Sequence, residues 1–163
     1  MNTVPTLFLD FDGVLHPQGC VALDEDFRLL QNPELFCWRG ILADVLRPSP
    51  ATRIIVSSDW RRLFDDENLI RLLGPALGHR FAGVVETFSS NRADEVLTEA
   101  ARRGLSNWIA VDDHPSVAEA RRNGDKRFVV CNPDTGLSNP SVIAELDTWA
   151  KLSKSTVEGE GAC

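Results

Sequence analysis

The chain has 163 residues, with 24 acidic and 17 basic side chains, a formal net charge of −7 and a hydrophobic content of 43%. This length suits one domain with a core of its own. No apolar run approaches the roughly 20 residues that cross a bilayer. The acidic balance disfavours strong, non-specific binding to nucleic acid and to anionic membranes. Residues 1–10 lack the basic start of a signal peptide, so we expect a cytoplasmic protein.

The first half of the chain alternates between short apolar runs and helical patterns. Residues 6–11 form an apolar run that is long enough for a buried strand and too short for a helix. Apolar residues at helical spacing predict a helix over 38–46. The β-branched run 53–57 predicts a second strand. A second helical pattern covers 63–73, where the polar residues 65–68 suggest a break, and 83–85 is the expected third strand.

The second half of the chain continues the alternation. A helical face begins at Arg92 and stops at Gly104. The run 108–111 predicts a fourth strand, and Pro115 opens a short helix. Residues 127–131 predict a fifth strand, and a capped helix follows from Asn139-Pro140.

Five repeats of strand and helix predict an α/β fold with a Rossmann-like, five-stranded parallel sheet and helices on both faces. Residues 1–152 are expected to form this domain. Residues 153–163 carry no periodic apolar face, which predicts a flexible C-terminal tail. Sheets of this kind bind ligands at the carboxyl ends of their strands, so functional residues are expected there.

Carboxylates follow the first and fourth expected strands. Asp10 and Asp12 are two residues apart, which places their side chains on one side of an extended chain, roughly 6–7 Å apart. Asp112 and Asp113 end the fourth strand. Each acid alone is typical of an ordinary turn. If the two strands are neighbours, however, carboxylates about 6 Å apart repel by roughly 3 kcal/mol at an effective dielectric of 20. A hard cation such as Mg2+ would remove that repulsion, so the four acids predict a metal site.

Polar and basic residues near the other strand ends suit a phosphate group. Ser57 and Ser58 end the second strand, where hydroxyls and backbone N–H groups can hold an anion, although a plain helix cap has the same composition. Arg92 begins a helix and could add a cation, although exposed arginines without a role are common. Together with the acids and a metal, these groups favour phosphoryl transfer through a carboxylate nucleophile.

The order of these motifs resembles the haloacid dehalogenase (HAD) superfamily. The segment DFDGVL at 10–15 resembles its first motif, DxDGx(T/V), and IIVS at 54–57 resembles the second, an apolar strand that ends in Ser or Thr. Arg92 is the best match to the Lys or Arg of the third motif. IAVDD at 109–113 looks like the fourth, an apolar strand that ends in paired acids. Three shorter runs also resemble the small HAD domains found alone in bacteria or within predicted RNA-repair proteins; they are 57–61, 108–113 and 132–138.

The resemblance implies a role for each matching residue. Asp10 would be the nucleophile and a Mg2+ ligand. Asp12 would protonate the leaving group, later activate water, and bind Mg2+ through its backbone carbonyl. Ser57 would hold the phosphoryl oxygens, with Ser58 as the alternative, and Arg92 would stabilise the aspartyl-phosphate.

The resemblance also implies the rest of the metal site. Asp113 would be the direct ligand and Asp112 would bind through water or support the ligands. The presence of Asp12 favours a phosphatase over a dehalogenase, since dehalogenases of the superfamily generally lack this second acid.

The expected site is open. Residues 16–33 are short and polar, and no large insertion precedes Arg92, so no large cap domain is expected. An open site would suit a terminal phosphate on a bulky substrate, such as a nucleic-acid end or a phosphoprotein. Arg61 could add to a basic rim around it, and His16 follows the first motif closely enough to touch the substrate.

Two alternatives stay open. A phosphoacceptor receiver domain also has a parallel sheet, clustered acids and a late lysine such as Lys126, but it carries an adjacent acidic pair after its first strand and the phosphorylated Asp after its third. A HAD-like binding module without activity is the other alternative, and the intact pair of Asp10 and Asp12 weighs against it.

Overall fold

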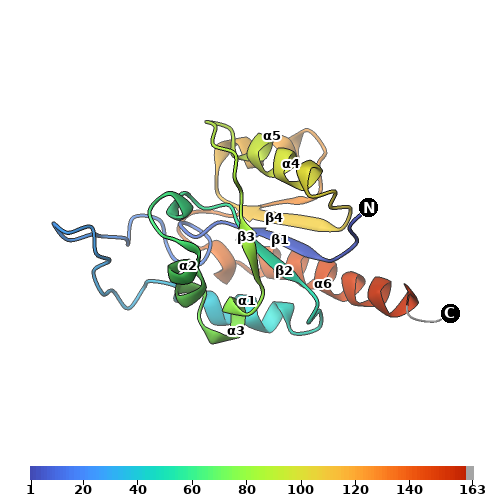
Figure 1. Cartoon of the computed structure of the whole chain (residues 1–163), viewed down its shortest axis with the longest axis horizontal. Coiled ribbons are helices and arrows are strands. Elements are labelled where there is room, and N and C mark those ends of the chain that lie inside the picture. The colour runs from blue at the N-terminus through green and yellow to red at the C-terminus, as the bar shows by residue number, and fades with distance from the viewer. Residues whose placement is uncertain (161–163) are drawn as a thin grey trace.

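The computed structural model describes residues 1–160 of the chain, and the side-chain environments of residues 1–154 (Figure 1). Five strands form one parallel sheet; they are β1 (Thr6–Leu9), β2 (Arg53–Val56), β3 (Phe81–Val84), β4 (Trp108–Asp112) and β5 (Phe128–Val130). Their order across the sheet is β3-β2-β1-β4-β5. The predicted α/β fold with five parallel strands is therefore confirmed.

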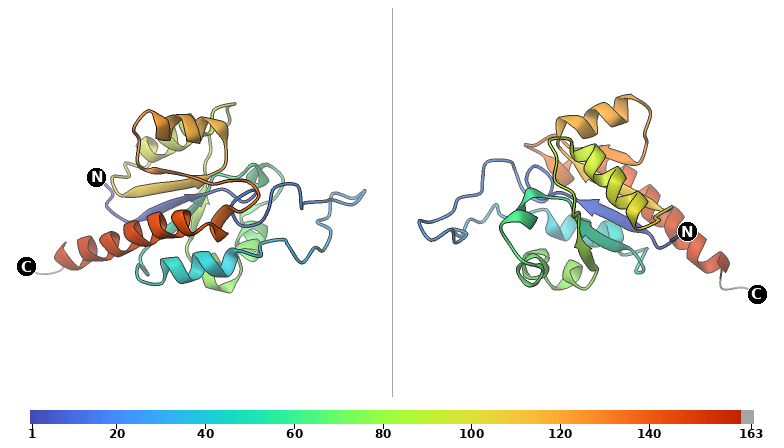
Figure 2. Two further views of the ribbon diagram at one scale, coloured as in Figure 1. Left: turned by 180° about the vertical axis from the view of Figure 1, so that it is seen from behind. Right: turned by 45° about the horizontal axis from the view of Figure 1, so that its top comes forward.

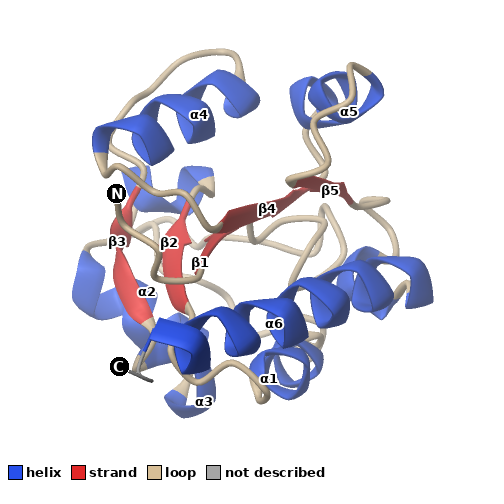
Figure 3. Ribbon diagram, turned by 90° about the vertical axis from the view of Figure 1, so that its right-hand side faces the viewer, coloured by secondary structure: helices blue, strands red, loops and turns tan. Residues whose placement is uncertain are grey.

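Helices cover both faces of this sheet, as Figure 3 shows end-on. One face carries α4 (Arg92–Arg102) and α5 (Pro115–Arg122). The other face carries α1 (Arg39–Leu46), α2 (Asp66–Leu73), α3 (Pro75–Gly78) and α6 (Pro140–Glu160). The view from behind in Figure 2 shows α6 alongside α1 on this second face. Two short 3-10 helices, η1 (Asp59–Arg62) and η2 (Gly136–Ser138), complete the described elements.

Successive strand residues supply the two cores alternately, because neighbouring side chains of a strand point to opposite faces. In β1, Leu7 and Leu9 pack into the core beneath α1 and α6. Phe8 packs into the smaller core beneath α4 and α5, where its ring meets Trp108 edge-on at 5.6 Å between centroids. All four residues of β1 are buried, so this strand runs through the centre of the domain.

The strand order creates a topological switch between β1 and β4. The chain winds outward from β1 to β3 and then returns to β4 on the other side of β1. The register pairs Leu9 with Val111, so the carboxyl ends of β1 and β4 lie side by side. Ligand sites in open α/β sheets form at such points.

Two segments differ from the sequence-based expectation. The helix expected over 63–73 is shorter in the structure. α2 begins only at Asp66, and residues 63–65 connect it to η1, because Asp65 is extended and its carboxylate accepts a bond from the Asn68 N–H at 2.9 Å. The helix α6 continues to Glu160, where a loose tail is expected from residue 153. Ser153 is buried and contacts the Asn107 side chain, which extends the packing of this helix. Residues 161–163 lie outside the described residues, and the domain boundary stays a prediction.

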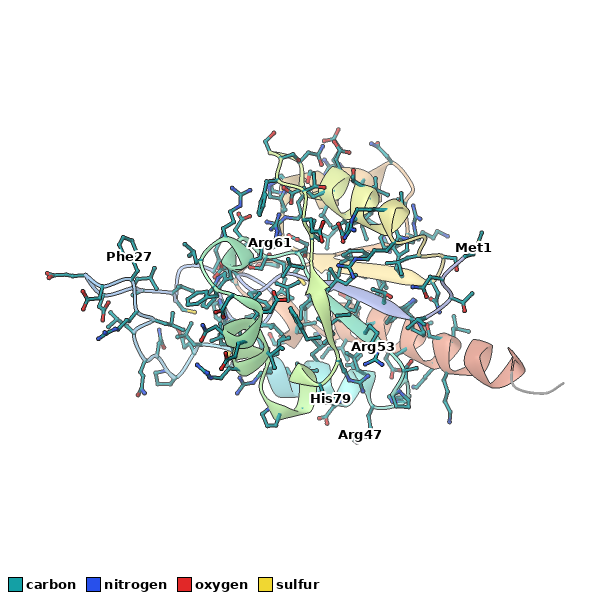
Figure 4. The ribbon with its side chains drawn as sticks, viewed as in Figure 1. Met1, Phe27, Arg47, Arg53, Arg61 and His79 are labelled. Atoms are coloured by element: carbon teal, nitrogen blue, oxygen red, sulfur yellow. The ribbon has the colours of Figure 1, made fainter. Side chains whose placement is uncertain are left out.

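The segment between β1 and α1 is an extended loop. It leaves the carboxyl end of β1 and carries one antiparallel bridge, between Leu23 and Leu29. Phe27 lies far from the body of the domain, as Figure 4 shows, and is 76% exposed. Within residues 1–160, no helix is long and apolar enough to span a membrane.

Candidate active site

Three carboxylates meet at the switch point. Asp10 directly follows β1 and Asp112 ends β4, so the strand register makes them neighbours. Asp113 follows directly. One carboxylate oxygen from each of these three acids lies within 4.8 Å of the others. The convergence expected from the sequence depends on β1 and β4 being adjacent, and the sheet order confirms that they are.

A glycine makes this approach possible. Gly13 has a positive φ of 72°, which favours glycine over other residues. A Cβ at this position would also overlap the Asp113 carboxylate. The strand end can therefore turn sharply beside the acids only because residue 13 has no side chain.

Burial and mutual repulsion raise the pKa values of the three acids. The pKa of Asp10 lies well above its ordinary value, first because of burial and then because of the charge of Asp112. Burial raises the pKa of Asp112 to about 6, although Arg92 opposes this shift. Burial and the charge of Asp10 raise the pKa of Asp113 to about 7. The ionised cluster is therefore unfavourable by itself, and its three carboxylate oxygens fit a hard divalent cation.

Arg92 supplies the one guanidinium that faces this cluster among the described residues that line the cavity. It is the first residue of α4, and its Nη1 lies 3.0 Å from Asp112 Oδ2 and 3.5 Å from Asp10 Oδ1. Burial opposes its charge, but the carboxylates, above all those of Asp112 and Asp10, raise the pKa of Arg92 above its ordinary value. The arginine is therefore a fixed cation beside the acids.

Glu95 holds this arginine in place. Its Oε2 accepts bonds from Arg92 Nε at 3.1 Å and from Arg61 Nη2 at 3.0 Å, and the carboxylate is buried. Arg61, labelled in Figure 4, also donates to three backbone carbonyls, those of Ser57, Val85 and Thr87. Contact between Arg61 and a substrate would require it to give up these bonds, and that role stays a prediction.

The two serines after β2 have different environments. Both are buried. The Ser58 hydroxyl accepts a bond from the Trp60 N–H at 3.4 Å and caps η1. Within residues 1–154, no hydrogen bond joins the Ser57 hydroxyl to another residue. This difference favours Ser57 over Ser58 as the phosphate-binding hydroxyl, which stays a prediction.

Asp12 lies beside the three-acid cluster and has other partners. Its Oδ1 is 2.9 Å from His16 Nε2, and its Oδ2 accepts a bond from Trp60 Nε1 at 2.8 Å. The expected metal contact of Asp12 involves its backbone carbonyl and stays a prediction. His16 is fully buried and contacts Asp12, so it lies behind the site rather than at its surface. Its expected contact with a substrate also stays a prediction.

These residues surround a small cavity of about 150 Å³. It is lined by Asp10, Asp12, Gln18, Asp59, Arg92, Asp112, Asp113 and His114. Asp59 and Glu95 have no role in the motif pattern. Asp59 directly follows Ser57-Ser58, and Glu95 is three residues after Arg92 on one helix face. His114 directly follows the acidic pair Asp112-Asp113. No sequence pattern indicates Gln18.

A larger cleft of about 570 Å³ lies elsewhere, between the amino ends of β4 and β5 and the helices α5 and α6. Trp108, Trp149 and Leu152 are among its lining residues. None of the site acids reaches this cleft, so it is separate from the chemistry described above.

The parallel sheet has the order β3-β2-β1-β4-β5, acids at its switch point and a DxDG segment after its central strand. These features define a HAD-like core. Residues 6–142 match the family model described as the HAD domain in Swiss Army Knife RNA repair proteins. The chain therefore belongs to this family, which confirms the resemblance drawn from the motifs. Comparisons with curated proteins and with solved structures found no match.

Proposed function

We propose that this chain is a Mg2+-dependent phosphomonoester hydrolase. The observation that carries the proposal is the buried cluster of Asp10, Asp112 and Asp113, with Arg92 fixed beside it. The carboxylates would hold a cation next to the positioned guanidinium. Together, the cation and the guanidinium would neutralise the charge that spreads over a phosphoryl group during its transfer. Membership of a HAD family supports the same reaction class.

In the proposed reaction, the chain's own residues supply the nucleophile and the proton transfers. Asp10 attacks phosphorus, the bond to the leaving oxygen breaks, and Asp12 gives that oxygen a proton. Asp12 then removes a proton from water, which attacks the aspartyl-phosphate and releases inorganic phosphate and the free Asp10 carboxylate. Ser57 donates a hydrogen bond to the phosphoryl oxygens, and Arg92 neutralises their charge.

Asp10, Asp112 and Asp113, together with the backbone carbonyl of Asp12, would hold Mg2+. When bound, the ion neutralises phosphoryl charge as a Lewis acid. Both oxygens of Asp112 already accept hydrogen bonds, from Arg92 Nη1 at 3.0 Å and from the His114 N–H at 2.9 Å. This supports Asp113 as the direct ligand, with Asp112 bound through water.

We further propose that the substrate is the terminal phosphate of an RNA end. The cavity of about 150 Å³ is smaller than the roughly 300–1,000 Å³ of sites that enclose a whole small ligand, so it would enclose the phosphate group and leave the rest outside. The description of the matched family names RNA repair. A net charge of −7 opposes broad affinity for RNA, which favours contacts limited to the end of the strand.

The test is phosphate release from 3′- and 5′-phosphorylated oligoribonucleotides, a phosphopeptide and an aryl phosphate, with Mg2+ or with EDTA. We expect Mg2+-dependent release, most rapid from an RNA end, that Asp10→Asn abolishes. Asp147→Asn is the matched control, because Asp147 is a partly exposed residue of α6 that pairs with Lys151. Absence of turnover on every substrate would contradict the proposal. Lasting phosphorylation by acetyl phosphate without turnover would instead support the receiver-like alternative.

A further inference from the structure

Both carboxylate oxygens of Asp12 contact ring nitrogens of buried aromatic residues. Oδ1 lies 2.9 Å from His16 Nε2, and Oδ2 lies 2.8 Å from Trp60 Nε1. Both distances are those of good hydrogen bonds. His16 belongs to the turn after β1 and Trp60 to η1 after β2, so two separate segments converge on one side chain.

The hydrogen bonds of His16 fix which of its nitrogens donates. The Phe36 backbone N–H donates to His16 Nδ1 at 3.3 Å, so Nδ1 is an acceptor and carries no proton. This network assigns the ring proton to Nε2, which therefore donates to Asp12 Oδ1. The indole N–H of Trp60 can only donate. Asp12 thus receives one N–H bond on each oxygen.

The two donors are held by an aromatic cluster around them. The His16 ring meets Phe36 edge-on at 4.9 Å and Trp60 at 5.7 Å between centroids. Trp60 also contacts Phe11 edge-on at 5.8 Å and stacks on Phe64 at 5.4 Å. Neither ring can turn away from Asp12 without repacking its neighbours, so the donors are rigid.

We propose that His16 and Trp60 are positioning residues that hold the Asp12 carboxylate in the orientation needed for proton transfer. The proposal rests on the proposed phosphatase function. The Asp12 side chain is 36% exposed, so without the two N–H donors it would sample several rotamers in water. General acid–base catalysis contributes about 10²–10⁴-fold only when the group is placed within reach of the reacting atoms.

A purely structural role for the same contacts predicts a different result. If His16 and Trp60 only stabilise the core, their loss lowers the amount of folded protein and affects every substrate equally. If they act through Asp12, their loss affects most the substrates whose leaving group needs a proton. An alkyl phosphate needs that proton, whereas dinitrophenyl phosphate has a stable leaving group.

The experiment compares kcat/KM for these two esters in the full-length protein with Mg2+. Trp60→Phe keeps the aromatic packing and removes the N–H, and His16→Leu removes the other donor. We expect each variant to lose about 10–100-fold on the alkyl phosphate and less than about 3-fold on dinitrophenyl phosphate. His16→Gln, whose amide can donate to Asp12, should restore part of the loss. In an Asp12→Ala background, Trp60→Phe should no longer distinguish the two esters.

Equal losses on both esters would overturn the positioning role while leaving the phosphatase proposal intact. A wild-type protein that turns over neither these esters nor the phosphorylated oligoribonucleotides would contradict the phosphatase proposal and the positioning role with it. The contact itself has a readout apart from activity. The Trp60 indole N–H resonance, assigned by its loss in Trp60→Phe, should move upfield in Asp12→Ala and stay in place in Asp147→Asn. An unmoved resonance in Asp12→Ala would also overturn the inference.

Discussion

Raising the pH should destabilise the metal-free protein, because the site acids have raised pKa values. The folded-state pKa is about 6 for Asp112 and about 7 for Asp113, against an ordinary value of 3.8 for each. A carboxyl group with a higher pKa in the folded chain binds protons more tightly there than in the unfolded chain. Its contribution to stability is therefore fully present below about pH 4 and is lost as the pH rises through about 6 to 7.

The size of the loss follows from the same two pKa values. One pKa unit corresponds to about 1.4 kcal/mol. Between pH 5 and pH 8, the ionisation of Asp112 lowers the free energy of unfolding by the equivalent of about one pKa unit, and that of Asp113 by about two. Together this is about 4 kcal/mol. Asp113 is partly exposed, and solvent screening reduces this to about 3 kcal/mol. At about 2–4 °C per kcal/mol for a chain of this size, the melting temperature should fall by roughly 6–12 °C.

Thermal melts at pH 5 and pH 8, in EDTA and in Mg2+, measure this effect. Mg2+ should raise Tm much more at pH 8 than at pH 5, because the ion competes with protons for the same carboxylates. Asp113→Asn should flatten the pH dependence in EDTA, whereas Asp147→Asn should leave it unchanged. A metal-free Tm that stays constant or rises from pH 5 to pH 8 would refute the reasoning, as would a Mg2+ shift of equal size at both pH values.

Two further substitutions probe the supports of the site. Glu95→Gln keeps the shape of the side chain but leaves the guanidinium groups of Arg61 and Arg92 without their shared buried carboxylate. Urea unfolding should show a loss of about 3–5 kcal/mol of stability, and kcat should fall. Unchanged stability would show that the two arginines find other partners. Phe8→Ala opens a cavity beneath α4 and α5 and should lower the free energy of unfolding by about 3–5 kcal/mol in the same assay. A loss below about 1 kcal/mol would mean that the surrounding side chains fill the cavity.

The strands and three of the acids could be predicted because their signals are local. A buried parallel strand is a short apolar run, and each of the five predicted runs overlaps an observed strand. The motif residues Asp10, Asp112 and Asp113 stand at the ends of such runs. The general rule that ligands bind at the carboxyl ends of parallel strands places them at one edge of the sheet. Their convergence depends also on β1 and β4 being neighbours, which the strand order shows.

The partners of Asp12 could not be predicted, because they depend on long-range packing. Trp60 is 48 residues from Asp12 along the chain, and no pattern in the sequence links them. His16 closely follows the first motif, and yet its ring is fully buried. The chain folds back there, since the Gly13 N–H bonds to the His16 carbonyl at 2.9 Å. Residue type and proximity to a motif do not reveal burial.

In the proposed function, the charge of the cavity would make metal binding and phosphate binding depend on each other. Its lining contains five aspartates and one arginine, so the ionised site without a metal ion has a net negative charge and repels a phosphate group. A divalent ion held by the carboxylates reduces that repulsion and adds a direct attraction. In the proposed function, the ion would therefore be needed for binding the phosphate as well as for the reaction that follows. By thermodynamic linkage, bound phosphate must tighten Mg2+ binding by the same factor by which Mg2+ tightens phosphate binding. On the proposed function, this acidic chain would thus select a single terminal phosphate and still reject the polyanionic backbone behind it.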